Sequence, residues 1–536
     1  MRVSPGVSQQ DFTAALHQFE TAVGREWLFT SDDDLHLYRD AYSLFWDEDA
    51  ERVASAAVAP ESVEQVQQIM RVANRYRIPI YPISTGKNLG YGGSAPVYSG
   101  SVVLDLKRMN RVVEVDERNA SCVVEPGVSY FDMYRHLQSV GSRLWIDVPD
   151  PGWGSLIGNA LDNGGGYTAP AYRNHFEAHC GMEVVLANGE ILRTGMGALP
   201  GAKTWQQYKF GYGPFLDGIF KQSNMGVVTK MGFWLFPEPE SYLSGAVSTP
   251  RHDDIIRIVD IFNYLENTMA VHGLPSISSP LYPIFAISDP ELAALHAAAE
   301  GPDPIALQGY ADRKGIPFWN CSLKFYGAPN VVRAQWEHAQ ERFAAIPGAK
   351  FREGEFYKLP LTPEQRAQVH APEFGIPSLA MFSVGARSAM NPLPANGHFW
   401  FSPIIPRTGE AVIEANRVIR RTARELKIPI MVFSPPVGCW ARAFILVLAI
   451  PVSRVPEEDR RLRVAVKQLI RVCADHGWGE YRTAPAFMDT VSEVYSYNDH
   501  IQRRVGESIK DALDPNGILS AGRYGLWPKH LRNRHT

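Results

Sequence analysis

The chain has 536 residues, too many for one ordinary domain and enough for two or three domains with full hydrophobic cores. Apolar residues make up 45% and charged residues 21%, the balance of a folded globular protein without long disorder. Its 53 basic and 57 acidic residues give a net charge of −4, without the basic excess of proteins that neutralise phosphates. Nucleic acid is therefore not expected as a partner.

The five cysteines are scattered, odd in number and without CxxC spacing. This pattern predicts neither a disulfide framework nor a zinc site, and it favours a reducing compartment. The N-terminus lacks a basic head followed by an apolar run, and no later stretch of about 18 uncharged apolar residues occurs. We therefore expect a cytoplasmic protein with no metal site and no membrane anchor.

The first predicted element is an amphipathic helix at residues 8–23, capped by Ser8 or Asp11. After a polar stretch to about residue 50, ASAAVAP predicts a strand, ESVEQVQQIMRVANRYR a helix, and IPIYPIS a second strand. SVVLDL, RVVEVD and SCVVEPG predict short strands, and MEVVLANGEILRTG predicts two strands around an Asn188-Gly189 turn. The first domain is expected to end near residue 240, where PEPES breaks the pattern.

Strands alternate with long helices from residue 242 to about 480. Strands are predicted in WNCSLKFYG, HFWFSPII, IPIMVFS and ARAFILVLAI, and helices in VVRAQWEHAQERFAAI and EAVIEANRVIRRTARELK. This alternation suggests an antiparallel sheet covered on one face by helices, in ferredoxin-like style. The Gly- and Pro-rich tail, DALDPNGILSAGRYGLWP, is expected to pack back on the first domain.

Two glycine-rich loops are candidates for ligand binding. STGKNLGYGG, residues 84–93, puts small residues where backbone N–H groups can converge on an anion. It is not a Walker A loop, because Asn88 stands where Ser or Thr would hold magnesium, and it lacks Rossmann spacing. Alone, it is equally compatible with a tight turn. The second run, GWGSLIGN at residues 152–159 followed by three glycines at 164–166, favours an extended ligand such as a dinucleotide.

The segments TGKNLGYGGSAP, CGMEVVLANGEILRTGMGALPG, KFGYGPFLDGIFKQSNMGVVTKMGFWLFPEP and GEYRTAPAFMD resemble the vanillyl-alcohol oxidase family of flavoproteins. The resemblance spans roughly residues 55–536. It implies an α+β fold, in which an FAD-binding domain formed by both ends of the chain is covered by a ferredoxin-like cap domain. The implied boundaries are 1–240 for the first part of the FAD-binding domain, 241–490 for the cap and substrate domain, and 491–536 for the returning C-terminal segment.

The resemblance also implies how FAD is held. His398, in PANGHFWFSPI, matches the position where the oxidases of the family attach the 8α-methyl group of FAD covalently. The cresol hydroxylase branch uses a tyrosine elsewhere. Without the resemblance, His398 is an ordinary strand histidine with a hydrogen-bonding role. The further residues implied for cofactor binding are Pro82, Ser84, Thr85, Gly86, Lys87, Asn88, Leu89, Gly90, Gly154, Ser155, Gly158, Asn159, Gly226, Val228 and Arg523.

Tyr91, Tyr481 and Arg482 correspond to the family trio that binds the phenolic oxygen of the substrate. Two hydroxyl donors and a permanent guanidinium stabilise phenolate over phenol, which lowers a pKa near ~10 and moves electron density toward the para carbon. Without the resemblance, Tyr91 is a packing aromatic, and the other two are surface residues that follow a helix.

Asp150, in DVPDPGWGS, matches an acidic residue that the oxidases keep near flavin N5, where a carboxylate can deprotonate water. The alternative is an Asp that serves a turn before proline, and Asp147 is the reserve candidate. Trp400 and Tyr167 are expected in the substrate pocket.

Two segments depart from the family pattern, so the pocket rim is expected to be reshaped. APAYRNHF replaces the usual PYGDHF, which leaves the roles of Tyr172, Arg173 and His175 open. The histidine pair often found in the cap is missing near residues 435–444, where Cys439, Trp440 and Arg442 stand.

Together these matches imply oxidation of para-substituted phenols, such as 4-alkylphenols, 4-alkylguaiacols, eugenol or vanillyl alcohol, through hydride loss to flavin and a quinone methide. We expect dioxygen as the acceptor, giving hydrogen peroxide, with a cytochrome c as the alternative. An oxidase of non-phenolic alcohols or hydroxy acids, and a flavin-binding protein without a working pocket, are further alternatives. A homodimer or higher homo-oligomer is the expected assembly.

Overall fold

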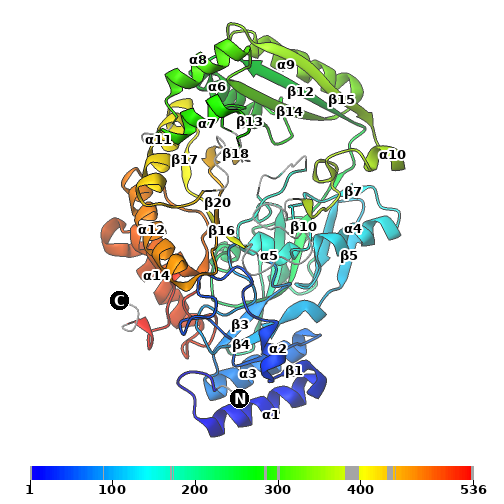
Figure 1. The fold of residues 1–536 in the computed structure, drawn as a ribbon. Coiled ribbons are helices and arrows are strands. Elements are labelled where there is room, and N and C mark those ends of the chain that lie inside the picture. The colour runs from blue at the N-terminus through cyan, green and yellow to red at the C-terminus, as the bar shows by residue number, and fades with distance from the viewer. Residues whose placement is uncertain are drawn as a thin grey trace.

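The computed structural model describes residues 3–88, 90–168, 172, 174–282, 287–298, 302–380, 397–430, 439–440 and 442–532. The N-terminal helices and strands lie at one end of the molecule, and a sheet with long helices lies at the other end (Figure 1). Helices from the last third of the chain run along one side between these ends.

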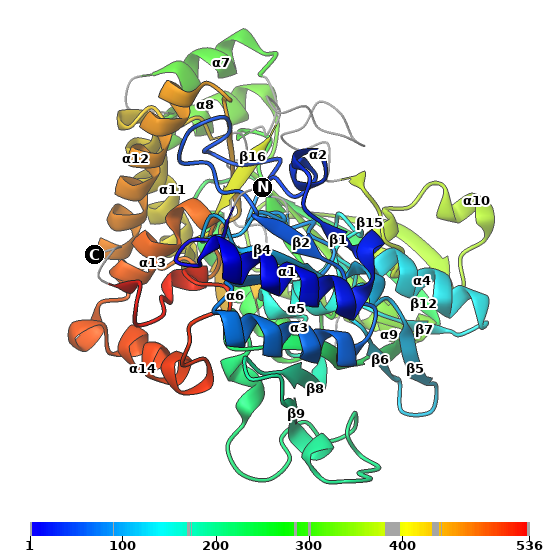
Figure 2. The ribbon, with the colours of Figure 1, turned by 90° about the horizontal axis from the view of Figure 1, so that it is seen from below.

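The first sheet contains the predicted strand, helix, strand unit. Its central strand β4 is parallel to both β2 and β3, and α3 connects those two neighbours. Helix α3 begins after Ser62, whose Oγ accepts a 3.3 Å bond from Gln65 N, and its apolar residues recur at helical spacing on one buried face. Helix α1 packs beside α3 (Figure 2). The elements are α1 (Gln9–Val23), β1 (Leu28–Phe29), α2 (Asp32–His36), β2 (Ala56–Val58), α3 (Val63–Tyr76), β3 (Ile80–Ile83) and β4 (Val102–Asp105).

The second sheet is antiparallel and has the order β5-β6-β10-β8-β9. Strands β8 and β9 form the hairpin predicted at Asn188-Gly189, where Gly189 has the positive φ of 82° that such a tight turn favours. The elements here are β5 (Val112–Asp116), β6 (Ser121–Val124), α4 (Tyr130–Ser139), β7 (Leu144–Trp145), α5 (Leu156–Leu161), β8 (His179–Val185), β9 (Ile191–Arg193), β10 (Val227–Trp234) and β11 (Phe236–Pro237).

The third sheet has the ferredoxin-like arrangement that the alternation of strands and helices suggested. Its order is β13-β14-β12-β15, all neighbours are antiparallel, and α9 packs on β12 and β14. Helix α6 lies beside α9, at the upper end in Figure 1. The elements are β12 (Ser241–Thr249), α6 (Asp254–Asn267), β13 (Ser276–Ser278), α7 (Pro290–Ala297), α8 (Pro304–Lys314), β14 (Trp319–Gly327), α9 (Pro329–Phe343), β15 (Lys350–Lys358) and α10 (Pro363–Arg366).

The strands after residue 397 do not join this sheet, contrary to the sequence prediction. They form two small sheets, β16-β20 and β17-β19-β18, which pack into the same hydrophobic core as α11 and α12. The predicted strand IPIMVFS is not a strand at residues 428–430, and its residues 431–434 lie outside the described ranges. The elements are β16 (His398–Phe401), β17 (Ile404–Pro406), α11 (Gly409–Glu425), β18 (Cys439–Trp440), β19 (Ala443–Ile445), β20 (Leu448–Pro451) and α12 (Pro456–Asp475).

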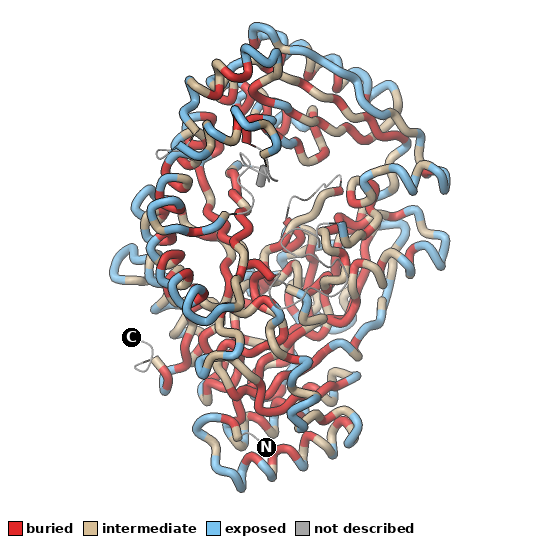
Figure 3. Tube along the Cα trace, viewed as in Figure 1, coloured by how far each residue is buried: buried red, intermediate tan, exposed pale blue. Residues whose placement is uncertain are grey.

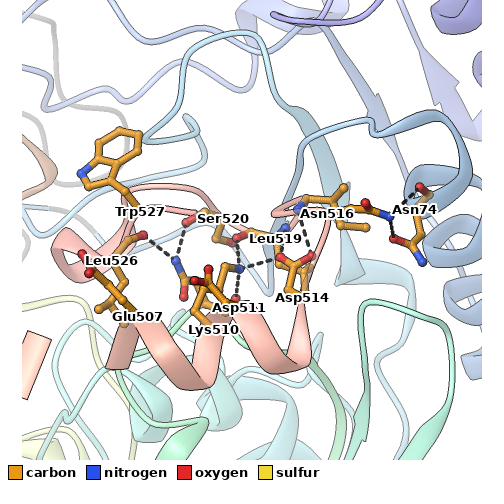
Figure 4. Close-up of polar contacts among 12 residues, drawn as sticks. Asn74, Glu507, Lys510, Asp511, Asp514, Asn516, Leu519, Ser520, Leu526 and Trp527 are labelled. Carbon is orange, nitrogen blue, oxygen red and sulfur yellow. Dashed lines mark hydrogen bonds and ion pairs between the residues drawn. The ribbon is translucent and has the colours of Figure 1, made fainter. Parts of the chain in front are cut away.

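The C-terminal segment, with α13 (Met488–Val494) and α14 (Tyr497–Leu513), returns to the first sheet. Ile80 N in β3 donates to Ile518 O at 2.7 Å. The fully buried Lys510 of α14 ties this helix to its surroundings, because its Nζ donates to Asn224 O at 2.6 Å, Asp514 Oδ2 at 2.7 Å and Leu519 O at 2.7 Å (Figure 4).

Three large hydrophobic cores fill the molecule. The first-sheet core draws on residues between 12 and 109 together with Val185, Ala187, Val227, Ile518 and Leu519. The second-sheet core draws on residues between 122 and 235, and the third on residues between 243 and 487 and on Leu44. Buried residues follow the strands and the inner faces of the helices, while the outer helix faces are exposed (Figure 3).

Candidate active site

The first glycine loop follows β3 and approaches Trp400, a predicted pocket residue, at Gly90. Gly86 and Gly90 have positive φ values of 66° and 82°. A Cβ at Gly90 would lie 2.5 Å from Cδ1 of Trp400, so only glycine lets the loop approach this ring. Burial lowers the pKa of Lys87, whose Nζ lies 5.2 Å from the ring of Trp153. Leu89 lies outside the described residues.

The second glycine loop packs on the first at the start of α5. A Cβ at Gly158 would lie 2.4 Å from Ser84 Oγ, whereas Gly154 faces open space. Ser155 is the N-cap of α5: its Oγ accepts from Gly158 N at 3.1 Å and donates to Pro126 O at 2.6 Å, so its hydroxyl serves the helix. The two loops together form a bare backbone surface that fits a dinucleotide.

Other residues predicted for cofactor binding have structural surroundings of their own. Pro82 pairs with Leu104 between β3 and β4. A Cβ at Gly226 would lie 2.4 Å from Val184 Cγ1, and Val228 is buried in β10.

The predicted phenol-binding trio is brought together, although Tyr91 and Arg482 are far apart in the sequence. The guanidinium carbon of Arg482 lies 3.7 Å from the ring centre of Tyr91 and 5.6 Å from that of Tyr481. The hydroxyl of Tyr91 and Ser402 Oγ are 2.7 Å apart. The trio therefore forms a compact polar group in a buried place.

Electrostatics at the trio favour neutral tyrosine beside charged arginine. Burial, together with the oxygen of Tyr481, raises the pKa of Tyr91 well above its usual value, against the opposing effect of Arg482. Burial acts to lower the pKa of Arg482, but the surrounding oxygens of Tyr481, Tyr91 and Asp162 outweigh it and raise that pKa. At neutral pH the group offers hydroxyl donors and one positive charge to an anionic ligand.

Asp162, at the end of α5, is a site residue that the sequence did not predict. Its carbonyl oxygen accepts from Arg482 Nη1 at 3.2 Å, and Oδ2 accepts from Asn88 Nδ2 at 2.5 Å. Its Oδ1 accepts from Arg523 Nη2 at 3.2 Å and from the hydroxyl of Tyr524. Asp162 thus joins the first glycine loop, Arg482 and the C-terminal segment.

Glu480 is a second residue without a sequence signal beyond its place beside Tyr481. It is buried, and its Oε2 accepts from Ser402 N at 3.1 Å. Burial raises the pKa of Glu480 to about 8. Its proton is therefore held at neutral pH, next to the serine that contacts Tyr91.

His398 stands on β16 with its ring against two aromatic rings. The ring centres of Trp400 and Tyr42 lie 4.5 Å and 5.1 Å from that of His398. Burial lowers the pKa of His398 to about 4, and its buried Nδ1 has no hydrogen-bond partner among the described residues. A neutral imidazole with a free ring nitrogen can act as a nucleophile, which fits the predicted attachment of flavin.

Asp150 and Tyr167 complete the site on its other side. Asp150 Oδ2 accepts a hydrogen bond from Ser378 Oγ. Burial raises the pKa of Tyr167 to about 12, with contributions from Asp150 and Tyr481, so both of these residues lie within electrostatic reach of Tyr167. Trp400 stacks near Tyr91, with ring centres 6.4 Å apart, so the predicted pocket residues converge.

The reserve candidate Asp147 has a different environment. Its Oδ2 lies 3.0 Å from His175 Nε2, and Oδ1 accepts from Thr168 N at 2.9 Å. His175 Nδ1 in turn lies 2.6 Å from Asn159 Oδ1. This buried pair therefore supports the chain that carries Tyr167, and Arg173 next to it lies outside the described residues.

Within the described ranges, no group of three or more His, Cys, Asp or Glu side chains is arranged to hold a metal ion. Cys122, Cys180, Cys321 and Cys473 are buried thiols. No helix in the part of the chain that the structure describes is long and apolar enough to cross a membrane.

Comparison with known proteins agrees with this geometry. A family model described as an FAD binding domain matches residues 54–195. The chain is 33% identical over 527 residues to the 4-cresol dehydrogenase [hydroxylating] flavoprotein subunit of Pseudomonas putida, and the match covers 97% of each protein.

Two solved structures are similar over the whole chain. The 4-ethylphenol oxidase from Gulosibacter chungangensis, in its isoeugenol complex, has a TM-score of 0.83 and 35% identity and covers 99% of this chain and 100% of its own. p-Cresol methylhydroxylase with substrate bound has a TM-score of 0.82 and 31% identity and covers 98% and 99%. The chain therefore belongs to the vanillyl-alcohol oxidase type family of FAD-dependent oxidoreductases, as its sequence predicted.

Proposed function

We propose that this protein oxidises para-substituted phenols, 4-alkylphenols first among them, at the benzylic carbon. The observation that carries the proposal is Arg482, whose side chain is only 12% exposed and which keeps its charge between two tyrosines. The names of the similar full-length proteins, 4-cresol dehydrogenase and 4-ethylphenol oxidase, describe phenol oxidation and support the same substrate class.

The trio binds the substrate as its phenolate. Tyr91 and Tyr481 donate hydroxyl hydrogen bonds to the phenolic oxygen, and Arg482 compensates its negative charge. Because the site is buried, these interactions are stronger than in water. The phenolate moves electron density toward the para carbon, so a hydride can leave the benzylic position, and FAD supplies the hydride acceptor when bound.

Asp150 controls the fate of the resulting para-quinone methide. Its carboxylate takes a proton from a water molecule that adds to the benzylic carbon, which yields a benzylic alcohol. Loss of a β-proton from an alkyl chain instead yields an alkenyl phenol, and a benzylic alcohol substrate yields an aldehyde. Oδ1 of Asp150 is buried and has no hydrogen-bond partner among the described residues, which supports its role as the proton acceptor.

FAD is held by the two glycine loops, the Gly226–Val228 stretch and Arg523, and it is linked covalently to His398. The neutral imidazole, whose Nδ1 has no hydrogen-bond partner in the described part of the chain, supports this linkage. Acid precipitation of the purified protein tests it: the pellet of the wild type should stay yellow, and that of His398→Ala should be colourless, because its flavin is extracted. A colourless wild-type pellet contradicts a covalent bond.

Dioxygen is the proposed final acceptor, and a cytochrome c is the alternative. The test reduces the protein anaerobically with 4-ethylphenol, 4-propylguaiacol, eugenol or vanillyl alcohol and then admits air. Rapid bleaching followed by reoxidation with peroxide supports a phenol oxidase. Bleaching without reoxidation indicates a cytochrome acceptor, and the absence of bleaching by every phenol contradicts the proposed substrate class.

The same proposal divides the chain into residues 1–240 and 491–536 for FAD and residues 241–490 for the cap. The core that spans residues 243–487 and the return of Ile518 and Leu519 to the first core support this division.

A further inference from the structure

Asp150 presents its two carboxylate oxygens to different surroundings. Oδ2 accepts the hydrogen bond from Ser378 Oγ, while Oδ1 is buried and without a partner in the described part of the chain. A buried carboxylate oxygen without a donor is costly. An orphaned oxygen beside Tyr167 is therefore a feature that needs a function.

Ser378 donates its hydroxyl hydrogen bond to Asp150, because another contact fixes the orientation of the hydroxyl. Its Oγ already accepts from Ala380 N at 3.2 Å, which leaves the O–H to point at the carboxylate. Its carbonyl oxygen accepts from Gly152 N at 2.8 Å. Ser378 is thus joined to the Asp150 loop by both its main chain and its side chain.

The segment at residues 371–378 is held rigidly on its other side by the ferredoxin-like sheet. Glu373 accepts from the hydroxyl of Tyr242 at 2.6 Å and forms a 2.7 Å ion pair with Lys324. Burial opposes the shift, but His370, Lys324 and Tyr242 together lower the pKa of Glu373 to about 2, so the anchor stays charged. Thr168 Oγ1 donates to Pro372 O at 2.8 Å and ties the segment to the loop that carries Tyr167.

The backbone at Gly152 and the side chain of Pro377 are in close contact. A Cβ at Gly152 would lie 2.5 Å from Cβ of Pro377. Pro377, the residue before Ser378, therefore packs directly on the backbone next to Asp150. A residue from the cap half of the chain can fix the rotamer of a carboxylate in the FAD half.

We infer that Ser378 is a positioning residue, which holds Asp150 with Oδ1 free to accept the proton of the water molecule that adds to the quinone methide. This inference rests on the proposed function. In the step, the water oxygen forms a bond to the benzylic carbon, the exocyclic π electrons return to the ring and restore the phenolate, and the water proton moves to Oδ1. Ser378 thereby sets the ratio of benzylic alcohol to alkene.

The test compares Ser378→Ala, Ser378→Thr and a matched control, Ser244→Ala, with 4-ethylphenol as substrate. Ser244 accepts a 2.9 Å bond from Glu355 N in the cap sheet, so its removal costs a similar contact away from the site. Two quantities are measured: the rate of anaerobic flavin reduction, and the ratio of 1-(4-hydroxyphenyl)ethanol to 4-vinylphenol among the products.

We expect the flavin of Ser378→Ala to be reduced by 4-ethylphenol at nearly the wild-type rate. The ratio of alcohol to alkene among the products should fall about tenfold. Ser378→Thr, which keeps the hydroxyl, should restore the ratio. A ratio in Ser378→Ala equal to that of Ser244→Ala overturns the inference, as does a wild type that forms no alcohol. Failure of 4-ethylphenol and the other phenols to reduce even the wild type is the distinct result that overturns the proposed function itself.

Discussion

Arg482 shows how a single side chain can keep its charge in a buried place. Burial alone would lower its pKa, but three nearby groups, Tyr481, Tyr91 and Asp162, reverse that effect. A motif could locate the arginine in the sequence. It could not locate Asp162, whose contacts to Asn88 and Arg482 span 74 and 320 positions of the chain and exist only after folding.

Substitution of Arg482 tests the phenolate hypothesis directly. Arg482→Lys keeps a positive charge but loses the planar fork, so we expect kcat/KM for 4-ethylphenol to fall on the order of a hundredfold. Arg482→Gln loses the charge as well, so its kcat/KM should fall further. Steady-state kinetics measure both, with 4-ethylanisole as the control substrate, because this methyl ether cannot form a phenolate and should be inert with every variant. A Gln variant as active as the wild type is incompatible with phenolate binding by Arg482.

Glu480 should make stability depend on pH. Burial raises the pKa of Glu480 from 4.5 to about 8, so between these values the folded state holds a proton that the unfolded state has released. The resulting stability is fully present below the unfolded value of 4.5 and is lost as pH rises through about 8. We expect the Tm of the wild type to fall more steeply than that of Glu480→Gln between about pH 5 and about pH 9.

Differential scanning calorimetry at several pH values measures this difference. The exposed Glu457, replaced by Gln, is the matched control and should follow the wild-type curve. If Glu480→Gln and the wild type lose stability in parallel, the carboxyl of Glu480 does not bind its proton as tightly as its burial indicates.

At the scale of elements, local sequence signals predicted most of what lies before residue 240. The helix at Gln9–Val23, the unit from β2 to β3 and the β8–β9 hairpin all form where caps, periodicity and turn residues indicated. The later small sheets were predicted wrongly as part of one large sheet. Short apolar runs such as those in β16 and β19 define a strand but not its partner, since pairing depends on contacts across the whole cap.

The glycine loop after β3 depends on one close approach. In Gly90→Ala, the new Cβ would lie 2.5 Å from the Trp400 ring, at a φ of 82° that alanine adopts only with strain of about 1–2 kcal/mol. We expect Trp400 to be displaced and FAD loading to fall, measured as the ratio of absorbance near 450 nm to that near 280 nm. Gly141→Ala is the control, because this glycine also has a positive φ, of 70°, but its Cβ meets no atom within 4 Å. Equal loading of the two variants would mean that the loop tolerates the collision.

At the scale of the whole molecule, the C-terminal segment packs against the first sheet, which the N-terminal part of the chain forms. The sequence predicted that the glycine- and proline-rich tail packs back on the first domain, and Ile518 pairs with Ile80 of β3. The sequence did not predict the hydrogen bonds of Lys510 that hold this segment in place. Lys510 looks like an ordinary surface residue of an amphipathic helix, yet it is fully buried and bonded to three separate parts of the chain (Figure 4).

Removing this lysine should destabilise the assembled fold more than any surface change on the same helix. Lys510→Met leaves Asp514 as a buried charge without its partner, which costs about 3–5 kcal/mol. We expect a clear fall in Tm and earlier proteolysis within residues 491–536, measured by calorimetry and limited digestion. Arg504→Met is the control, because its side chain is 51% exposed and its contacts, with the backbone oxygens of Asn498 and Asp499 and the exposed carboxylate of Asp499, lie within its own helix. Because Lys510 reaches Asn224 in the second-sheet half and Leu519 beside β3, its loss should also weaken FAD retention, although it is remote from the phenol-binding trio. A Lys510→Met protein as stable as Arg504→Met would mean that packing alone holds the C-terminal segment in place.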